Sequence, residues 1–208
     1  HALSDAQLAA LTSDQAAALS AAGAFLNLTG AQIAQLPADA IDSVPANVID
    51  NLNSQQVAGL SNAQLAALTS DQAAQLGSRF LLNDLNNAQL AQLSAAAIDS
   101  VPPIVIARLT GAQLAALRND QIAALTYDQV TAFISSNALS SLDNSQIALL
   151  SNGAIAGVPF TRISQLSAIE VAALRNDQLF ALNEFQVESL AALGSLNNLI
   201  STQIVQIR

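Results

Sequence analysis

Residues 60–75, LSNAQLAALTSDQAAQ, decide the fold, because the rest of the chain is built from variants of this stretch. It holds two copies of an eight-residue unit, which we call the octad. Each octad has an anchor Leu, a Ser or Thr, two free positions, a Gln, an aliphatic residue or Ala, and two further positions that are often Ala. The anchors are Leu3, Leu11, Leu19, Leu28, Leu36, Val44, Leu52, Leu60, Leu68, Leu76, Leu85, Leu93, Val101, Leu109, Leu117, Leu125, Phe133, Leu142, Leu150, Val158, Leu166, Leu174, Leu182, Leu190, Leu199 and Ile207.

Each octad predicts one short helix. A Ser or Thr followed three residues later by Gln is a capping box, in which the two side chains satisfy each other's backbone amides. Apolar residues before the cap and at the fourth helical position, such as Leu60 and Leu65, form a hydrophobic staple. We therefore expect helices of about five to seven residues. The pairs Ser61 with Gln64, Thr69 with Gln72, Thr110 with Gln113 and Thr126 with Gln129 fit the capping box.

Two other architectures fit less well. One continuous helix would let its apolar stripe drift by roughly 80° per octad, and it would contain five prolines. A parallel β-solenoid would need better strand formers than Ala, Gln, Asn and Asp, and alternating polarity, which is absent. Proline suits the first turn of a short helix. The prolines, all at the cap or one residue beyond it, are Pro37, Pro45, Pro102, Pro103 and Pro159. The predicted fold class is all-α, a solenoid or superhelix of short capped helices.

The octads are nested in a super-repeat of 57 residues. The spacing between anchors is eight residues except at four places, where it is nine. The nine-residue spacings follow Leu19, Leu76, Phe133 and Leu190, and the pairs Val44-Pro45, Val101-Pro102 and Val158-Pro159 repeat with the same period. We predict a single repeat domain over residues 1–208, a fragment of a longer array. It contains a partial copy at 3–27, full copies at 28–84, 85–141 and 142–198, and a partial copy at 199–208.

The 57-residue period has two interpretations. It is either one superhelical turn of seven short helices, with the ninth residue correcting the register, or the unit of gene duplication alone. The constant phase of the extra residue favours the first, in which Val44, Val101 and Val158 would line up along the superhelix axis. The segments that carry the extra residue lose the Gln and gain Gly, Asn and Phe, so they predict a corner or a longer loop. They are residues 21–27, 77–84, 134–141 and 191–198.

Composition and charge exclude several classes of partner. The 208 residues are 52% hydrophobic, 3% aromatic and 10% charged, whereas an ordinary domain is about 25% charged. The net charge is −9, with six Arg and no Lys, so there is no basic stripe for nucleic acid or anionic lipid. The sequence contains no apolar run long enough to span a membrane, so we predict no insertion into a bilayer. The absence of Cys excludes a disulfide framework and a thiolate metal site.

A column of aspartates at the second helical position is the first candidate site. Carboxylates in a ladder could bind Ca²⁺, but that ion needs several converging oxygens, and no loop with alternating Asp or Asn and a closing Glu is present. An acid in the first helical turn complements the helix dipole, which we take as the reason for the column. We therefore expect no metal site. The column is Asp14, Asp39, Asp71, Asp120, Asp128 and Asp177.

The second candidate is the column of glutamines, which could form a hydrogen-bonding face for carbohydrate. The capping box already explains this column, and Glu170 serves the same cap in its own octad. The column is Gln7, Gln15, Gln32, Gln56, Gln64, Gln72, Gln89, Gln113, Gln121, Gln129, Gln146, Gln178, Gln186 and Gln203.

A few residues depart from the octad pattern. Arg118 and Arg175, each followed by Asn-Asp-Gln, replace the capping hydroxyl. They could mark a binding stripe, but we expect solvated surface charges. Four aromatic residues in the last two copies could stack on sugars, but we predict that they belong to the core; they are Tyr127, Phe160, Phe180 and Phe185. The single histidine, His1, stands at the terminus, and we interpret it as the remnant of a tag.

The residues for catalysis are few. The chain has no Cys, no Lys and no internal His, and it lacks a glycine-rich phosphate loop. Catalytic groups are usually unique in a sequence, and almost every feature here is repeated. We therefore expect no enzymatic activity, no catalytic residue and no cofactor.

Three resemblances follow from these patterns. Residues 109–114, LTGAQL, resemble the first-helix signature of the repeats in TAL effectors, but the longer period, the second helix and the base-reading pair are missing, so DNA binding is not carried over. Runs of short capped helices resemble the α-superhelix of magnesium-transporter cytosolic domains and flagellar motor switch proteins. The Ala-, Asn-, Gln- and Ser-rich composition is similar to that of repeat regions in large secreted or surface adhesin-like proteins of bacteria.

The last resemblance implies a structural function. We expect a spacer or adhesive stalk in a secreted or cell-surface bacterial protein. The alternative is a binding module whose concave face holds a peptide or glycan. End-to-end self-association is a further expectation, because the terminal octads carry no polar cap.

Overall fold

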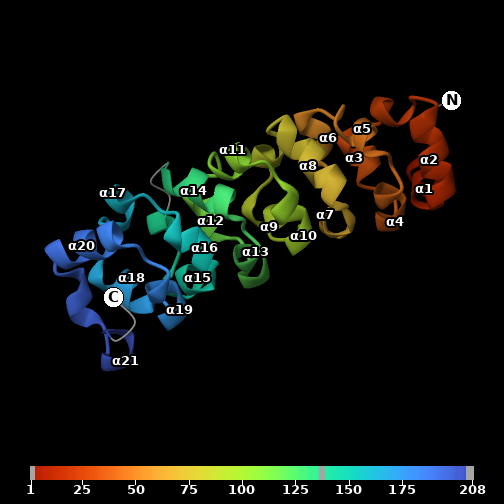
Figure 1. Ribbon diagram of the computed structural model, residues 1–208. Helices are drawn as coiled ribbons and strands as arrows, with labels where there is room; N and C mark the ends of the chain where they lie inside the picture. Colours follow the sequence, from red (N-terminus) through yellow and green to blue (C-terminus); the bar gives the residue numbers. More distant parts are fainter. Residues whose placement is uncertain (1–2, 136–138, 205–208) are drawn as a thin grey trace. The chain divides into compact units, whose positions relative to one another are not determined.

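The protein is described by a computed structural model that covers residues 3–135 and 139–204 (Figure 1). This part of the chain is all-helical and contains no strand, which confirms that the fold is all-α. The Cα atoms that lie close together form two groups, so the chain divides into two compact units, residues 1–105 and 106–208. The two units are described separately. His1 lies outside the described residues, so its interpretation stays a prediction.

The first unit contains short α-helices and two 3₁₀-helices, and the last residue of α11 belongs to the second unit. In chain order they are α1 (Asp5–Ala9), α2 (Ser13–Ala21), η1 (Phe25–Asn27), α3 (Gly30–Ile33), α4 (Ala38–Asp42), α5 (Ala46–Ile49), α6 (Ser54–Ala58), α7 (Asn62–Ala67), α8 (Ser70–Ser78), η2 (Leu81–Asp84), α9 (Asn87–Leu90), α10 (Ala95–Ser100) and α11 (Pro103–Ile106).

The second unit has the same kind of elements. They are α12 (Gly111–Ala115), α13 (Asn119–Ala123), α14 (Tyr127–Ser135), η3 (Leu139–Ser141), α15 (Asn144–Leu149), α16 (Asn152–Ala156), α17 (Phe160–Ile163), α18 (Ala168–Ala173), α19 (Asn176–Phe180), α20 (Glu184–Ala192), η4 (Ser195–Asn198) and α21 (Ser201–Ile204).

The helices begin where the capping boxes predict. At α8 the hydroxyl of Thr69 accepts a hydrogen bond from the Gln72 amide at 3.2 Å, and Gln72 Oε1 accepts one from the Thr69 amide at 3.0 Å. The other three predicted pairs form the same two bonds. Prolines occupy the N-cap of α4, α5 and α17, where the missing amide hydrogen has little effect.

Two aliphatic columns form the core of each unit. Every anchor from Leu36 to Leu199 is buried, and so are most of the apolar residues at the fourth helical position, such as Leu65 and Ile147. Complete burial of a Leu or Ile side chain contributes about 1.5–3 kcal/mol, whereas a helix of this length is unstable alone. Each helix therefore persists because it packs against others. The first four anchors, up to Leu28, are only partly buried.

The nine-residue spacings contain helical structure, where a corner or a longer loop was predicted. There the preceding helix extends to nine residues, in α2, α8, α14 and α20, and a 3₁₀-helix follows. The predicted length of five to seven residues is wrong for these helices, and also for the four-residue helices α3, α5, α9, α11, α17 and α21. A residue in the left-handed region ends three of the longer helices: Gly23, Phe80 and Gly194, with φ of 69°, 62° and 69°. The remaining equivalent position, Asn137, lies outside the described residues.

The glutamine side chains also join segments far apart in sequence. Besides accepting the capping bond, the Nε2 group of Gln64 donates to the carbonyl oxygens of Ile33 and Leu36, each at 2.7 Å. We call this set of bonds the glutamine ladder. Its described members are Gln56, Gln64, Gln72, Gln89, Gln146, Gln178, Gln186 and Gln203, and the acceptors lie 28–31 residues earlier.

The ladder sets the distance along the chain between neighbouring segments. Each ladder Gln reaches the carbonyl of an anchor, which lies 28 residues earlier for Gln64 and 29 residues earlier for Gln89. The separation is 29 residues where a nine-residue spacing between anchors lies between the Gln and its acceptor. In both cases the acceptor is the anchor three octads before the octad that contains the Gln. Neighbouring segments are therefore three octads apart along the chain, so the interpretation of 57 residues, or seven octads, as one turn is wrong.

Helix packing follows the same spacing. Within the first unit α4 lies beside α7 and α8 beside α10, and within the second unit α15 lies beside α18 and α17 beside α20 (Figure 1). These neighbours in space are helices three octads apart along the chain.

The ladder predicts a difference between two glutamines in identical local sequences. Gln15 and Gln72 both stand in TSDQAA and both complete a capping box, but Gln15 is exposed whereas Gln72 also donates to Ile41, Asp42 and Val44. Gln72→Ala leaves these buried carbonyls without a donor and should lower the free energy of unfolding by about 2–4 kcal/mol. Gln15→Ala should lower it by about 1 kcal/mol or less, because only a cap is lost.

Urea unfolding followed by circular dichroism measures both changes, and native-state hydrogen exchange locates them in the chain. Equal losses for the two variants would show that the ladder bonds contribute nothing beyond the caps.

Candidate functional site

The aspartate column does not form a site. Each of its members is exposed and lies in the first turn of a helix, where a carboxylate interacts favourably with the helix dipole. Among the described residues, no group of three or more His, Cys, Asp or Glu side chains is placed to hold a metal ion. The column therefore offers no converging oxygens for Ca²⁺.

The glutamine column is also unsuited to ligand binding over most of its length. From Gln56 onward its members are buried, and the described bonds direct their amide groups at backbone carbonyls. Of the remaining three, Gln7 and Gln15 are exposed and Gln32 is half-buried. Each of these three completes a capping box.

The prediction that the late aromatic residues belong to the core is wrong. Their exposed fractions are 49% for Tyr127, 53% for Phe160, 60% for Phe180 and 67% for Phe185. The rings of Phe160 and Phe185 lie 6.5 Å apart between centroids, with their planes tilted by 43°. These two residues come from α17 and α20, which pack together.

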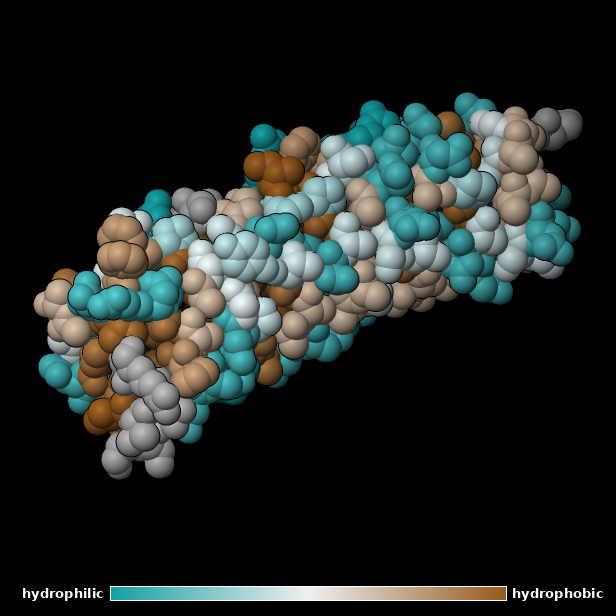
Figure 2. All heavy atoms as spheres, in the orientation of Figure 1, coloured by the Kyte–Doolittle hydropathy of each residue, from teal (hydrophilic) through white to brown (hydrophobic). Residues whose placement is uncertain are grey.

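Exposed apolar side chains are concentrated in the second unit. Among the described residues, Ile104 is the one large exposed hydrophobic side chain of the first unit, whereas the second unit has eight. Figure 2 shows apolar atoms at the surface of this unit around α18 and α20. Clustered exposed apolar groups mark surfaces that bind something more often than isolated ones do. The eight are Tyr127, Phe160, Ile169, Phe180, Phe185, Leu193, Ile200 and Ile204.

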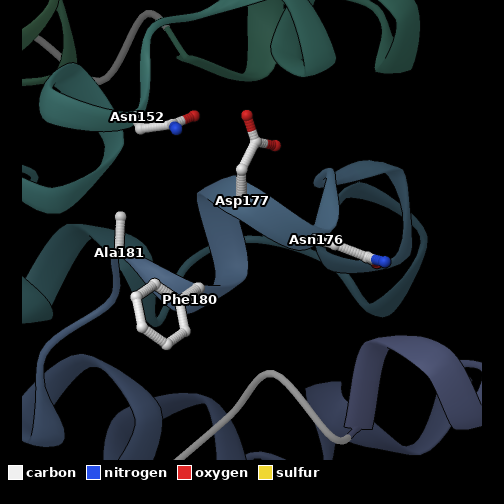
Figure 3. A pocket seen from close by; sticks show the side chains of 5 residues that line it. All are labelled: Asn152, Asn176, Asp177, Phe180 and Ala181. Carbon is white, nitrogen blue, oxygen red and sulfur yellow. The ribbon is translucent and has the colours of Figure 1, made fainter.

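A pocket of about 610 Å³ lies beside α19 in the second unit (Figure 3). In Figure 3 the side chains of Asn152 and Asp177 approach each other on one side, and the Phe180 ring projects from the other end of α19. Asn176 points away from Asn152 at the far edge. The volume lies in the range of small-molecule sites. The lining residues are Asn152, Asn176, Asp177, Phe180 and Ala181.

Arg175 holds the polar side of this pocket in place. Its Nε and one terminal nitrogen bond both carboxylate oxygens of Asp177, at 3.0 and 3.2 Å, and the same terminal nitrogen donates to Asn152 Oδ1 at 3.1 Å. Its other terminal nitrogen donates to the carbonyl of Ala148. One guanidinium group thus connects α15, α16 and α19. Arg175 was predicted to be a solvated charge; it is 42% exposed and ion-paired.

The ion pair has an electrostatic consequence. The hydrogen bond from Arg175 holds the pKa of Asp177 below its ordinary value, against a smaller opposing effect of burial, and a bond from Asn152 adds to the lowering. Arg118 lowers the pKa of Asp120 in the same way, at 2.8 Å between the charged groups. A lowered aspartate pKa stabilises the folded state above the ordinary pKa, and this contribution is lost as the pH falls through the lowered value. Because these groups are largely exposed, the effect on stability is small.

The preceding super-repeat keeps the Arg and the Asp but lacks both the ring and the Asn. Residues 118–121 and 175–178 are both Arg-Asn-Asp-Gln, but Ala123 stands where the later copy has Phe180, and Ala95 stands where it has Asn152. Ala123 is exposed, as Phe180 is. The pocket therefore depends on two substitutions at surface positions of the repeat.

Tyr127 has a different explanation. Its ring lies over Gly157, where a Cβ atom would collide with ring carbons and the hydroxyl. At the equivalent positions of the first unit, Ser100 donates a hydrogen bond to the Ser70 carbonyl at 2.8 Å, and Ser43 donates one to the Ser13 carbonyl at 3.0 Å. A Ser–Ser pair has thus been replaced by a Tyr–Gly pair in this copy.

Membrane association through a spanning helix finds no support in the described residues. None of the helices there is both long and apolar enough to cross a bilayer.

The Tyr127–Gly157 exchange predicts energetic coupling. Gly157→Ser alone should lower the free energy of unfolding by about 1–2 kcal/mol, because the half-exposed ring must move. In a Tyr127→Ser background the same change should cost much less, because the double variant recreates the pair found at Ser70 and Ser100. A thermal or urea double-mutant cycle measures the coupling, and strictly additive effects would contradict the assigned contact.

The Arg175–Asp177 pair predicts a change in titration. In Arg175→Ala the pKa of Asp177 should rise toward the ordinary aspartate value, because its main hydrogen-bond donor is lost. The carboxyl ¹³C shift of Asp177, followed by NMR across a pH series, measures it. Arg118→Ala is the matched control, since it should raise the pKa of Asp120 and leave Asp177 unchanged. An Asp177 titration that is the same with and without Arg175 would exclude this cause.

Comparison with known proteins adds no family: neither a protein-family model nor a curated protein matches this sequence.

Proposed function

We propose that the chain is a non-enzymatic structural segment, an α-solenoid that serves as a spacer or adhesive stalk in a secreted or surface-exposed bacterial protein. The observation that carries the proposal is the recurrence of one contact, from a Gln amide to the carbonyl of an anchor 28 or 29 residues earlier, throughout each unit. Where every step uses the same contact, more copies lengthen the structure without requiring a new core.

Composition supports the same proposal. A chain that is rich in Ser, Thr and Asn and has only 10% charged residues gives few features for a specific charged partner. A spacer needs a uniform core and a tolerant surface, and the octad provides both. Repeat proteins of this kind derive their stability from each repeat and its nearest neighbours.

A second function, binding of a peptide or glycan, is supported by one specific observation. The second unit exposes aromatic rings, including Phe160, Phe180 and Phe185, at surface positions where a scaffold alone has no need of them. Under this alternative the repeats supply the rigid support, and the substituted surface supplies the binding site.

Deletion of one super-repeat tests the scaffold. Removal of residues 85–141 keeps every Gln in register with an anchor, so the shortened chain should retain its helical content and melt at a similar temperature. The control removes residues 89–141, which leaves residues 85–88 behind and shifts the acceptors by half an octad. That variant should lose stability next to the junction.

Small-angle scattering provides the test of the spacer itself. Deletion of residues 85–141 and insertion of a second copy should shorten and lengthen the particle by equal increments. If the maximum dimension did not depend on the number of copies, the chain would not be a spacer.

A further inference from the structure

Two exposed aromatic rings meet where α17 packs beside α20 (Figure 1). Phe160 is the first residue of α17 and is 53% exposed, and Phe185 is the second residue of α20 and is 67% exposed. The ring centroids lie 6.5 Å apart, near the upper end of the range for aromatic pairs. The contact between the rings therefore leaves more than half of each residue open to solvent, as an apolar patch on the surface.

Two glutamates stand beside Phe185 on the outer face of α20. Glu188 lies three residues after Phe185 and four residues after Glu184, and side chains at these spacings are neighbours on a helix surface. Both glutamates are exposed. Among the described residues, no ion pair includes either of them. The apolar patch thus has two negative charges at its edge that no cation of the described chain neutralises.

This combination is confined to one copy of the super-repeat. The earlier copies have neither a pair of rings nor a pair of acids at the four equivalent positions. Their residues there are Ala46 and Pro103 for Phe160; Ser13, Ser70 and Tyr127 for Glu184; Asp14, Asp71 and Asp128 for Phe185; and Ala17, Ala74 and Thr131 for Glu188.

Neither the rings nor the second acid helps the scaffold. Exposed rings add nothing to the buried core of the octad, and like charges four residues apart on a helix repel each other. Glu184 lies in the first turn and interacts with the helix dipole, but Glu188 lies in the middle of α20 and has no such role. Features that oppose stability and occur together on one surface indicate binding, because a partner can bury the rings and neutralise the charges.

We propose that Phe160, Phe185 and the two glutamates form a docking site for a basic peptide segment of a partner protein. The rings cover the apolar stems of Arg or Lys side chains and attract their cations, and the carboxylates pair with the charges. The proposal rests on the second function above and specifies its ligand.

The spacing of the two carboxylates favours one kind of segment. Side chains four residues apart on a helix are about 5–6 Å apart at Cβ. Alternate side chains of an extended peptide lie on one face, about 6.5 Å apart. The site therefore fits an extended segment with basic residues at alternate positions.

The test uses the full chain and three pentapeptides that are blocked at both ends. Leu-Arg-Ser-Arg-Leu has the proposed spacing, Leu-Arg-Arg-Ser-Leu has the same composition with adjacent bases, and the third peptide replaces both Arg of the first by neutral citrulline. At low salt the first peptide should shift the NMR amide signals of Phe160, Phe185 and Glu188. The second should bind about twofold or more weakly, because adjacent side chains of an extended segment point to opposite faces. The citrulline peptide should give no shifts.

Substitutions in the site should weaken binding of the first peptide. Phe160→Ala, Phe185→Ala and Glu188→Gln should each weaken it about two- to fivefold, because each removes one exposed contact. All three should keep the wild-type circular dichroism spectrum, and Glu188→Gln should melt no lower than wild type, because it removes like-charge repulsion. The matched controls are Ile104→Ala and Asp71→Asn, which remove an exposed apolar side chain and an exposed acid in the first unit and should bind normally.

Four results would overturn the proposal. They are the absence of shifts with the first peptide, equal binding of either comparison peptide, equal weakening by Asp71→Asn and Glu188→Gln, and self-association through the rings in place of peptide binding. Equal weakening would mean attraction to the net charge of −9 alone. Sedimentation velocity of wild type and Phe185→Ala detects self-association.

The experiment also separates the site from the functions proposed above. Shifts confined to residues outside α17 and α20 would overturn this site but leave peptide binding at another surface as the second function. The deletion and scattering tests do not depend on the peptides, so the docking site can fail while the spacer stands, and the reverse.

Discussion

The hydrogen bonds from a glutamine amide to the carbonyl oxygen of an anchor are the contacts on which the rest of the structure depends. A helix of four to nine residues cannot persist alone, and its last carbonyls have no partner within the helix. One Gln side chain meets both needs, because Oε1 closes its own helix N-terminus while Nε2 satisfies the end of an earlier helix. The same residue therefore begins one helix and ends another. Burial of the anchors and of the fourth-position aliphatic residues then follows from the register that these bonds impose.

Much of this arrangement could be predicted from the sequence because its causes are local. The capping box and the apolar staple lie within six residues of each other, so Ser61, Gln64 and Leu65 identify a helix start without further information. The step between neighbouring segments could not be derived in the same way. It depends on the partner of Gln Nε2, which lies 28–31 residues away and leaves no local signal.

The four late aromatic residues were wrongly predicted to be buried, because the prediction considered their hydrophobicity and not their position in the octad. The buried positions are the anchor, the Gln and the residue after it, as Leu174, Gln178 and Leu179 show. Tyr127, Phe160, Phe180 and Phe185 occupy other positions, which carry small or polar residues in most other octads. Phe133, by contrast, stands at an anchor position and is fully buried. Octad position thus separates residues that specify the fold from residues free to acquire other roles. The pocket beside α19 consists of the second kind, and this is why sequence periodicity alone revealed nothing of it.

The constant spacing of the ladder bonds also has a consequence for folding kinetics. The entropy lost on closing a loop grows only with the logarithm of its length, and the described ladder bonds each close a loop of 28–31 residues. No ladder bond among the described residues therefore costs much more closure entropy than another. Folding can therefore start at any point where two successive segments meet. It then propagates in both directions, and each added segment loses a similar amount of entropy. Opening follows the reverse course. It begins where neighbours are fewest, and the exposed Gln7 and Gln15 place one such point in α1 and α2.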